Sequence, residues 1–119
     1  MLYFILLIAT AVWHTLAMYF FLVHPRQVLK ALTNERPVSL IAVDVVRFLG
    51  ALNGGYVALA GWAAWQPLPL VWVGVVLANG SQFIIDLLAH RSVRWTTKLL
   101  PVTLIDCAFT VLFLLYITM

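Results

Sequence analysis

Four long apolar runs constrain the fold of this chain more than any other feature. They cover about residues 2–23, 40–65, 69–88 and 99–117, and only short polar segments separate them. A helix that crosses a bilayer needs about 20 predominantly apolar residues, and each run has that length. We therefore predict an all-α fold, a four-transmembrane-helix bundle, that forms a single domain over residues 1–119.

The composition agrees with an integral membrane protein. Hydrophobic residues make up 65% of the chain and charged residues only 9%, whereas soluble domains carry about 25% charged residues. The formal net charge of +3 would suggest nucleic acid as the partner of a soluble protein. Here we expect no nucleic-acid partner, because the basic residues lie in the loops between spans, where they orient a membrane protein.

The basic residues of the loops predict the orientation in the membrane. Loops 24–39 and 89–98 hold six of them: Arg26, Lys30, Arg36, Arg91, Arg94 and Lys98. The middle loop and both tails have no Lys or Arg. The positive-inside rule then places loops 24–39 and 89–98 in the cytoplasm and both termini on the extracytoplasmic side. We expect a multi-pass protein of the bacterial inner membrane or the endoplasmic reticulum.

The first loop has the pattern of a short helix of its own. Pro25 is suited to the first position of a helix. Val28, Leu29 and Leu32 would share one face of that helix, opposite the basic residues of the loop. An amphipathic helix of this kind lies in the membrane interface, so we predict a short interfacial helix on the inner leaflet.

A polar stripe interrupts the third span. Asn79, Gln82, Asp86 and His90 fall within an arc of about 80° on a helix of standard pitch. A carboxylate at mid-bilayer costs about 2.5–3.5 kcal/mol, so such groups should face protein and find partners. We therefore predict one network near the cytoplasmic side, either a structural contact between helices or a ligand or partner site. Its members would be Asp44, Arg47, Gln82, Asp86, His90 and Asp106.

Small residues in the second span predict close helix contacts. Gly50 and Gly54 form a GxxxG pattern, and Gly55 and Ala58 extend it on a neighbouring face. Such residues let helix backbones approach each other, within one chain, in a homodimer or with another membrane protein.

The polar residues of the first two spans outside this network carry no sequence motif. We expect His14, near the middle of the first span, to be a hydrogen-bonded core residue. Asn53 and Tyr56 in the second span receive no role from the sequence.

Catalytic and metal motifs are absent from the sequence. It has no HExxH zinc motif, no GxSxG nucleophile motif and no phosphate-binding loop. Asp86 and His90 could supply two metal ligands from one helix, but a site needs at least one more. The single Cys107 allows no disulfide within the chain. We predict no metal and no cofactor, and the lack of these motifs favours a protein without catalysis of its own while leaving an enzyme open.

Two short motifs resemble those of a known family. Arg47, Phe48, Leu49 and Gly50 correspond to an Arg-Thr-Phe-Gly-like run, and Ser81 to Asp86 correspond to a Gly-His-Phe-x-Ser-Glu signature. With the order of spans and loops, they resemble the small four-span ergosterol-biosynthesis scaffold family, which tethers sterol C-4 demethylation enzymes in the endoplasmic reticulum. Gln82 and Ile85 depart from that signature, and DoxX-like small membrane proteins are also similar. The resemblance implies a non-enzymatic scaffold and singles out Arg47, Phe83 and Asp86.

Three functions remain open from the sequence. The first is a non-enzymatic accessory or scaffold protein that binds membrane lipid or a partner membrane protein. The second is a homodimeric transporter of small molecules, driven by protons through Asp86 or Asp106. The third is a lipid- or sterol-binding protein or isomerase. The candidate ligand- or partner-binding residues are Asp44, Arg47, Asn79, Gln82, Phe83, Asp86, His90 and Asp106.

Overall fold

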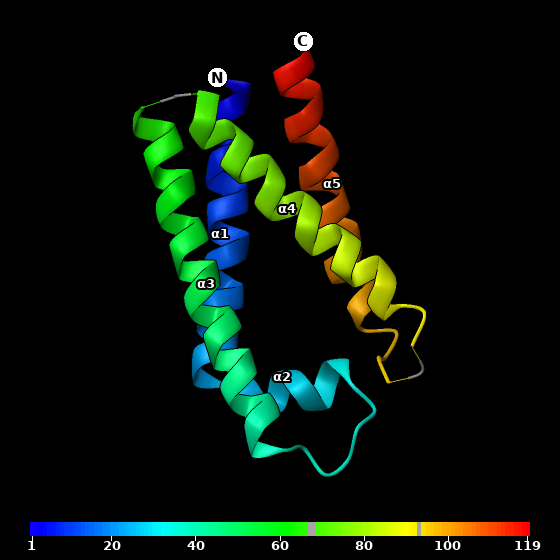
Figure 1. Cartoon of the computed structure of the whole chain (residues 1–119). Helices are drawn as coiled ribbons and strands as arrows, with labels where there is room; N and C mark the ends of the chain where they lie inside the picture. The colour runs from blue at the N-terminus through cyan, green and yellow to red at the C-terminus, as the bar shows by residue number, and fades with distance from the viewer. Residues whose placement is uncertain (67–68, 93) are drawn as a thin grey trace.

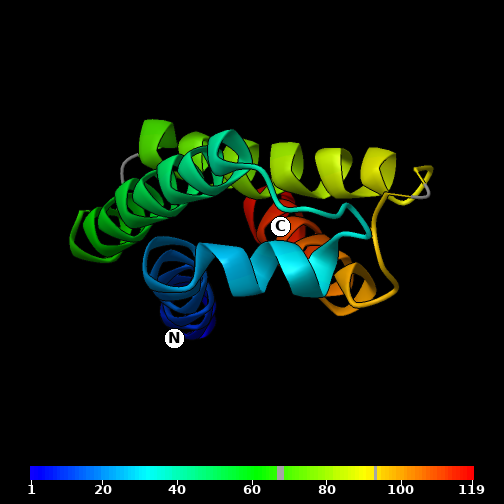
Figure 2. The same ribbon diagram turned by 90° about the horizontal axis from the view of Figure 1, so that it is seen from below.

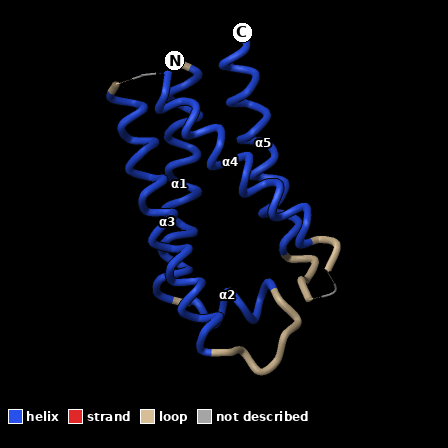
Figure 3. Tube along the Cα trace, viewed as in Figure 1, coloured by secondary structure: helices blue, strands red, loops and turns tan. Residues whose placement is uncertain are grey.

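The computed structural model describes residues 1–66, 69–92 and 94–119. The described residues form five helices: α1 (Leu2–Val23), α2 (Pro25–Leu32), α3 (Leu40–Trp65), α4 (Pro69–Ala89) and α5 (Leu99–Thr118). Figures 1 and 3 show these helices and the short loops that connect them. The all-helical fold is therefore the one that the sequence predicts.

Four of the helices are long and apolar enough to cross a membrane: α1, α3, α4 and α5. They match the four predicted spans, and α4 and α5 each end one residue later than expected. Their outward surface is apolar, with Ile5, Leu77 and Leu104 each more than half exposed. Soluble monomers rarely expose continuous apolar surface of this kind, so the surface is suited to contact with lipid.

Local sequence signals explain where the helices begin. Pro25 and Pro69 are the first residues of α2 and α4, a position in which proline loses no hydrogen bond. The Ser39 hydroxyl accepts a hydrogen bond from the Ala42 backbone N–H at 3.1 Å and so caps the start of α3. These signals fix the ends of the predicted spans.

The bundle consists of two helix pairs. The most extensive helix contact joins α1 to α3, and the next joins α4 to α5. Figure 1 shows both termini at one end of the molecule and α2 at the other, with the two pairs diverging toward α2. Two pairs that diverge leave room between them at the α2 end.

The apolar core fills the end of the bundle near the termini. Leu7, Ala63, Val75 and Phe113 are almost completely buried there, and they come from all four long helices. Each belongs to the first or last turns of its helix at that end. Lipid tails are as apolar as these side chains, so close packing between the helices, rather than removal from water, holds the two pairs together at this end.

Contacts between two loops hold the opposite end together. Figure 2 shows α2 lying across this end, beside the start of α5. The backbone N–H of Asn34 donates to the Arg94 carbonyl at 2.6 Å, and that of Thr96 donates to the Leu32 carbonyl at 2.8 Å. The hydroxyl of Thr96 also donates to the Ala31 carbonyl. The end of α2 is thus tied to the α4–α5 loop.

The small residues of α3 divide between the interior and the surface. A Cβ atom on Gly50 would lie 2.9 Å from Phe21 Cβ and 3.2 Å from the Leu22 backbone nitrogen, and one on Gly54 would meet Met18. The prediction of close helix contacts is right for these two glycines, which pack on α1. It is wrong within this chain for Gly55 and Ala58, because both are exposed and a Cβ on Gly55 would meet nothing within 4 Å.

Substitution of Gly50 by alanine should destabilise the protein, whereas the same change at Gly55 should not. The added methyl at Gly50 meets backbone of α1, and overpacking of this kind costs about 1–3 kcal/mol. The measurement is the free energy of unfolding in detergent, obtained by titration with a denaturing detergent. It compares Gly50→Ala, Gly55→Ala and the parent protein. Equal stability of the two variants would contradict the close contact of α1 and α3.

Candidate ligand-binding site

A buried polar cluster joins α1, α3 and α4 near the middle of the bundle. His14 Nδ1 lies 2.6 Å from Asn53 Oδ1, and His14 Nε2 lies 3.4 Å from Asn79 Oδ1. Asn79 Nδ2 donates to the Tyr56 hydroxyl, which is 3.1 Å from Thr10 Oγ1. All five side chains are buried. The expectation that His14 is a hydrogen-bonded core residue is confirmed.

Backbone carbonyls set the orientation of both amides in this cluster. Asn53 Nδ2 donates to the Leu49 carbonyl at 2.8 Å, and Asn79 Nδ2 donates to the Val75 carbonyl at 3.0 Å. Both amide oxygens therefore face the imidazole of His14. An amide oxygen only accepts, so the nearer nitrogen of the ring, Nδ1, carries the proton and donates it to Asn53.

A second polar cluster joins α4 to α5. The side chains of Asp86 and Asp106 are hydrogen-bonded to each other, and the Trp13 indole N–H donates to Asp106 Oδ1 at 3.1 Å. Beyond their mutual contact, Asp86 Oδ2 and Asp106 Oδ2 are buried without a hydrogen-bond partner. Carboxylate oxygens only accept hydrogen bonds, so one of the two carboxyl groups must carry a proton. With one proton, the pair holds a single negative charge.

His90 extends this second cluster by one helical turn. His90 Nε2 lies 2.8 Å from Thr103 Oγ1. The Thr103 hydroxyl donates to the Leu99 carbonyl, so it accepts from His90, and Nε2 carries the ring proton. The predicted stripe of α4 is therefore divided: Asn79 faces α1 and α3, whereas Asp86 and His90 face α5.

The prediction that Asp44 and Arg47 join this network is wrong. Their charged groups lie 3.7 Å apart on α3, and the side chains are 77% and 55% exposed, respectively. Both side chains lie on the outward face of α3 and pair with each other there, so neither needs a partner inside the bundle. Phe83 is half-buried and is not among the residues that line the pocket described below.

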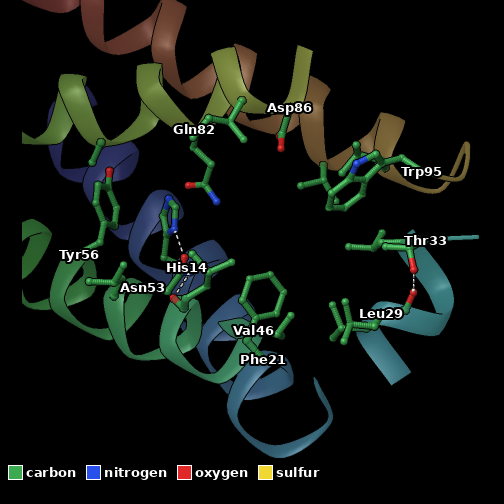
Figure 4. A pocket seen from close by; sticks show the side chains of 18 residues that line it. His14, Phe21, Leu29, Thr33, Val46, Asn53, Tyr56, Gln82, Asp86 and Trp95 are labelled. Carbon is green, nitrogen blue, oxygen red and sulfur yellow. Dashed lines mark hydrogen bonds between the residues drawn. The ribbon is translucent and has the colours of Figure 1, made fainter. Parts of the chain in front are cut away.

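A pocket of about 350 Å³ separates the two helix pairs at the α2 end. Figure 4 shows the Asp86 carboxyl and the Gln82 amide pointing into it from α4, with His14, Asn53 and Tyr56 along one side. The remaining lining is apolar except for Thr33. It includes the apolar face of α2, namely Val28, Leu29 and Leu32. The pocket thus connects the two polar clusters.

Most of the first cluster was not predicted from the sequence. Asn53 and Tyr56 received no role, yet both line the pocket. Asn53 is hydrogen-bonded to His14, and Tyr56 is hydrogen-bonded to Asn79. The signal was present, because a polar residue in the middle of a span needs a partner at the same depth. The depths of His14, Asn53 and Asn79 in their spans would have grouped these three residues together.

The described residues contain no group of three or more His, Cys, Asp or Glu side chains placed to hold a metal ion. Asp86 and His90 face different neighbours, Asp106 and Thr103, across the contact with α5.

The chain matches no family model, no curated protein and no solved structure. The resemblance to the ergosterol-biosynthesis scaffold family therefore stays a prediction from two short motifs.

Replacement of Asn79 by alanine should destabilise the bundle through the first polar cluster. The Tyr56 hydroxyl would lose its donor, and unsatisfied buried groups cost about 1–3 kcal/mol. Ser81→Ala on the same helix is the control, since the Ser81 hydroxyl is exposed and bonds only to the Ala78 carbonyl. If a titration with denaturing detergent finds the two variants equally stable, the first polar cluster does not contribute to the free energy of unfolding.

Proposed function

We propose that this chain is a non-enzymatic multi-pass membrane protein that binds an apolar, lipid-like molecule in the pocket between its two helix pairs. The observation that carries the proposal is the pocket itself. Its volume, about 350 Å³, lies within the range of about 300–1,000 Å³ that is common for small-molecule sites. Such sites are mostly apolar with a few polar groups that orient the ligand, and this pocket has that composition.

The position of the pocket supports entry of the ligand from the bilayer. Leu49 and Leu52 of α3 and Ile85 of α4 line the pocket and are also exposed on the outer surface. These residues mark an opening between α3 and α4, on a surface suited to lipid. A molecule dissolved in the membrane would reach the polar groups of the pocket without passing through water.

The placement of the pocket in the membrane follows from the basic loops. Loops 24–39 and 89–98 lie at the α2 end, so the positive-inside rule puts the pocket near the cytoplasmic leaflet and both termini outside. In this orientation α2 lies at the inner interface, with Arg26 and Lys30 exposed and its apolar face toward the pocket.

Cysteine labelling tests this orientation. In a Cys107→Ser background, Ser92→Cys should react with a membrane-impermeant maleimide only after the membrane is opened, because Ser92 lies in a cytoplasmic loop. Gln66→Cys should react in intact cells or sealed vesicles of the same orientation. The reverse pattern would place the pocket at the outer leaflet.

Other roles remain predictions from the sequence. The family resemblance implies that the chain holds a partner membrane protein, and the small exposed residues of α3 would permit a homodimer. Proton-driven transport and isomerase activity would both use Asp86, which is placed at the pocket. Ligand binding is common to the scaffold, transporter and isomerase hypotheses, so it is the function to test first.

Filling the pocket should abolish ligand binding. Ala78 lines the pocket, and Ala78→Phe would occupy part of it; Ala108→Phe adds the same ring to an exposed position of α5 and is the control. We expect at least one of decylamine, 1-decanol and decanoate to raise the Tm of the parent protein and of Ala108→Phe, but not of Ala78→Phe. A ligand at 100 times its Kd stabilises by about 2.7 kcal/mol.

The proposal fails if none of the three probes stabilises the parent protein, or if Ala78→Phe and Ala108→Phe respond alike. Mass spectrometry of lipids that co-purify with each variant gives a second readout. A molecule retained by Ala108→Phe and lost from Ala78→Phe would identify the natural ligand.

A further inference from the structure

The charge of the pocket distinguishes between kinds of ligand. Among the described residues that line it, Asp86 is the only one with a formal charge at neutral pH, and no Lys or Arg lines it. The exposed basic residues of α2, Arg26 and Lys30, lie outside the lining. An anionic head group would therefore meet a carboxyl group and no cation. A cationic head group would find its counter-charge.

Among the described residues, no Lys, Arg or His side chain forms a salt bridge with Asp86. Its neighbours on α4 are Gln82 and His90, and His90 donates a hydrogen bond to Thr103 of α5. Across from it on α5 is Asp106, whose other oxygen accepts from Trp13 of α1. The other helices also contribute side chains to the pocket. His14 of α1 can titrate, and α3 adds the neutral Asn53 and Tyr56. The face of α2 contributes aliphatic side chains, namely Val28, Leu29 and Leu32.

Two carboxyl oxygens at this place have no partner outside the pair. Asp106 is fully buried, and neither its Oδ2 nor that of Asp86 accepts a hydrogen bond from any other described residue. Asp86 lines the pocket, whereas Asp106 is not among its lining residues. One negative charge is thus held at the wall of an apolar cavity. Burial of a charge without a counter-charge is costly, and a monovalent cation in the pocket would remove that cost.

The rest of the lining suits an organic cation rather than a bare ion. Phe21, Tyr56 and Trp95 place aromatic rings in the pocket wall, and aromatic faces attract ammonium groups. The leucine and valine side chains of α2, α3 and α5 would contact an alkyl chain. A small inorganic ion would leave this apolar volume unfilled.

We propose that the pocket takes a lipophilic amine, bound as its ammonium ion, with Asp86 as the group that contacts the cation. Asp106 acts through Asp86 as a positioning residue, because its hydrogen bond holds the Asp86 carboxyl. The inference rests on the proposed function, since it names the class of ligand for the same pocket. The complex is neutral: one ammonium charge meets the one negative charge of the carboxyl pair, and no proton needs to leave.

Three probes with the same chain and different head groups test the inference. Decylamine is a cation at pH 7, 1-decanol is neutral and decanoate is an anion. Binding of each is measured by equilibrium dialysis against the protein in nanodiscs of zwitterionic lipid, with empty nanodiscs subtracted. We expect the Kd of decylamine to be at least about tenfold lower than that of 1-decanol, and decanoate to bind more weakly than both.

Variants at three aspartates separate the site from a general charge effect. Asp86→Asn should weaken decylamine binding at least about tenfold and change 1-decanol binding by a much smaller factor, and Asp86→Glu should restore much of the affinity of decylamine. Asp106→Asn should retain decylamine binding within about threefold, because the new amide donates to the Asp86 carboxylate and keeps the single charge. Asp44→Asn, an exposed acid of α3, is the matched control and should change nothing.

The possible results distinguish this inference from the proposed function. Equal binding of decylamine and 1-decanol, with no effect of Asp86→Asn, would overturn the choice of an amine and leave the apolar pocket intact. Loss of decylamine binding in Asp106→Asn as large as in Asp86→Asn would overturn the roles assigned to the two acids. Saturable binding of none of the three probes would overturn both proposals. If Asp86→Asn does not fold, the order of the three probes on the parent protein still decides.

Discussion

The structure depends on one constraint: a polar side chain within a membrane span must find its partners inside the protein. Lipid offers no hydrogen bonds, so each unsatisfied group in the hydrocarbon region costs several kcal/mol. In this bundle the polar groups gather in two clusters. His14, Asn53 and Asn79 link α1, α3 and α4, and Asp86 and Asp106 link α4 to α5. Both clusters adjoin the pocket, and their positions determine where helices meet and where space remains between them.

The two ends of the bundle are stabilised in different ways. Near the termini, apolar side chains of all four long helices form a filled core around Ala63, Val75 and Phe113. At the other end the helix pairs diverge, and backbone hydrogen bonds from Asn34 and Thr96 tie α2 to the α4–α5 loop. Loop contacts hold this end without filling it. A bundle with a packed apolar core at one end and a pocket at the other can be both stable and able to bind a ligand.

The fold followed from the sequence because span length and the signals that start a helix are local properties. Pro25, Ser39 and Pro69 marked helix starts, and the four apolar runs predicted the spans to within one residue. The site followed only in part. The stripe of Asn79, Gln82, Asp86 and His90 was found from helical pitch, but its division between two neighbours depends on packing angles that no single span encodes. Asp44 and Arg47 look like buried charges on hydropathy alone, yet they are exposed and pair with each other, because they lie on the outward face of α3.

The charge of the pocket and the class of its ligand both depend on the pair of carboxyl groups, Asp86 and Asp106. Infrared difference spectroscopy of the protein in lipid measures directly whether a protonated carboxyl group is present at neutral pH. We expect a carbonyl stretch of a protonated carboxyl group in the parent protein and in Asp44→Asn. It should be lost in Asp106→Asn, where an amide takes the place of one carboxyl group and donates the hydrogen bond to the other. A parent protein without that band at neutral pH would contradict the account, since Asp86 and Asp106 could not then be hydrogen-bonded to each other.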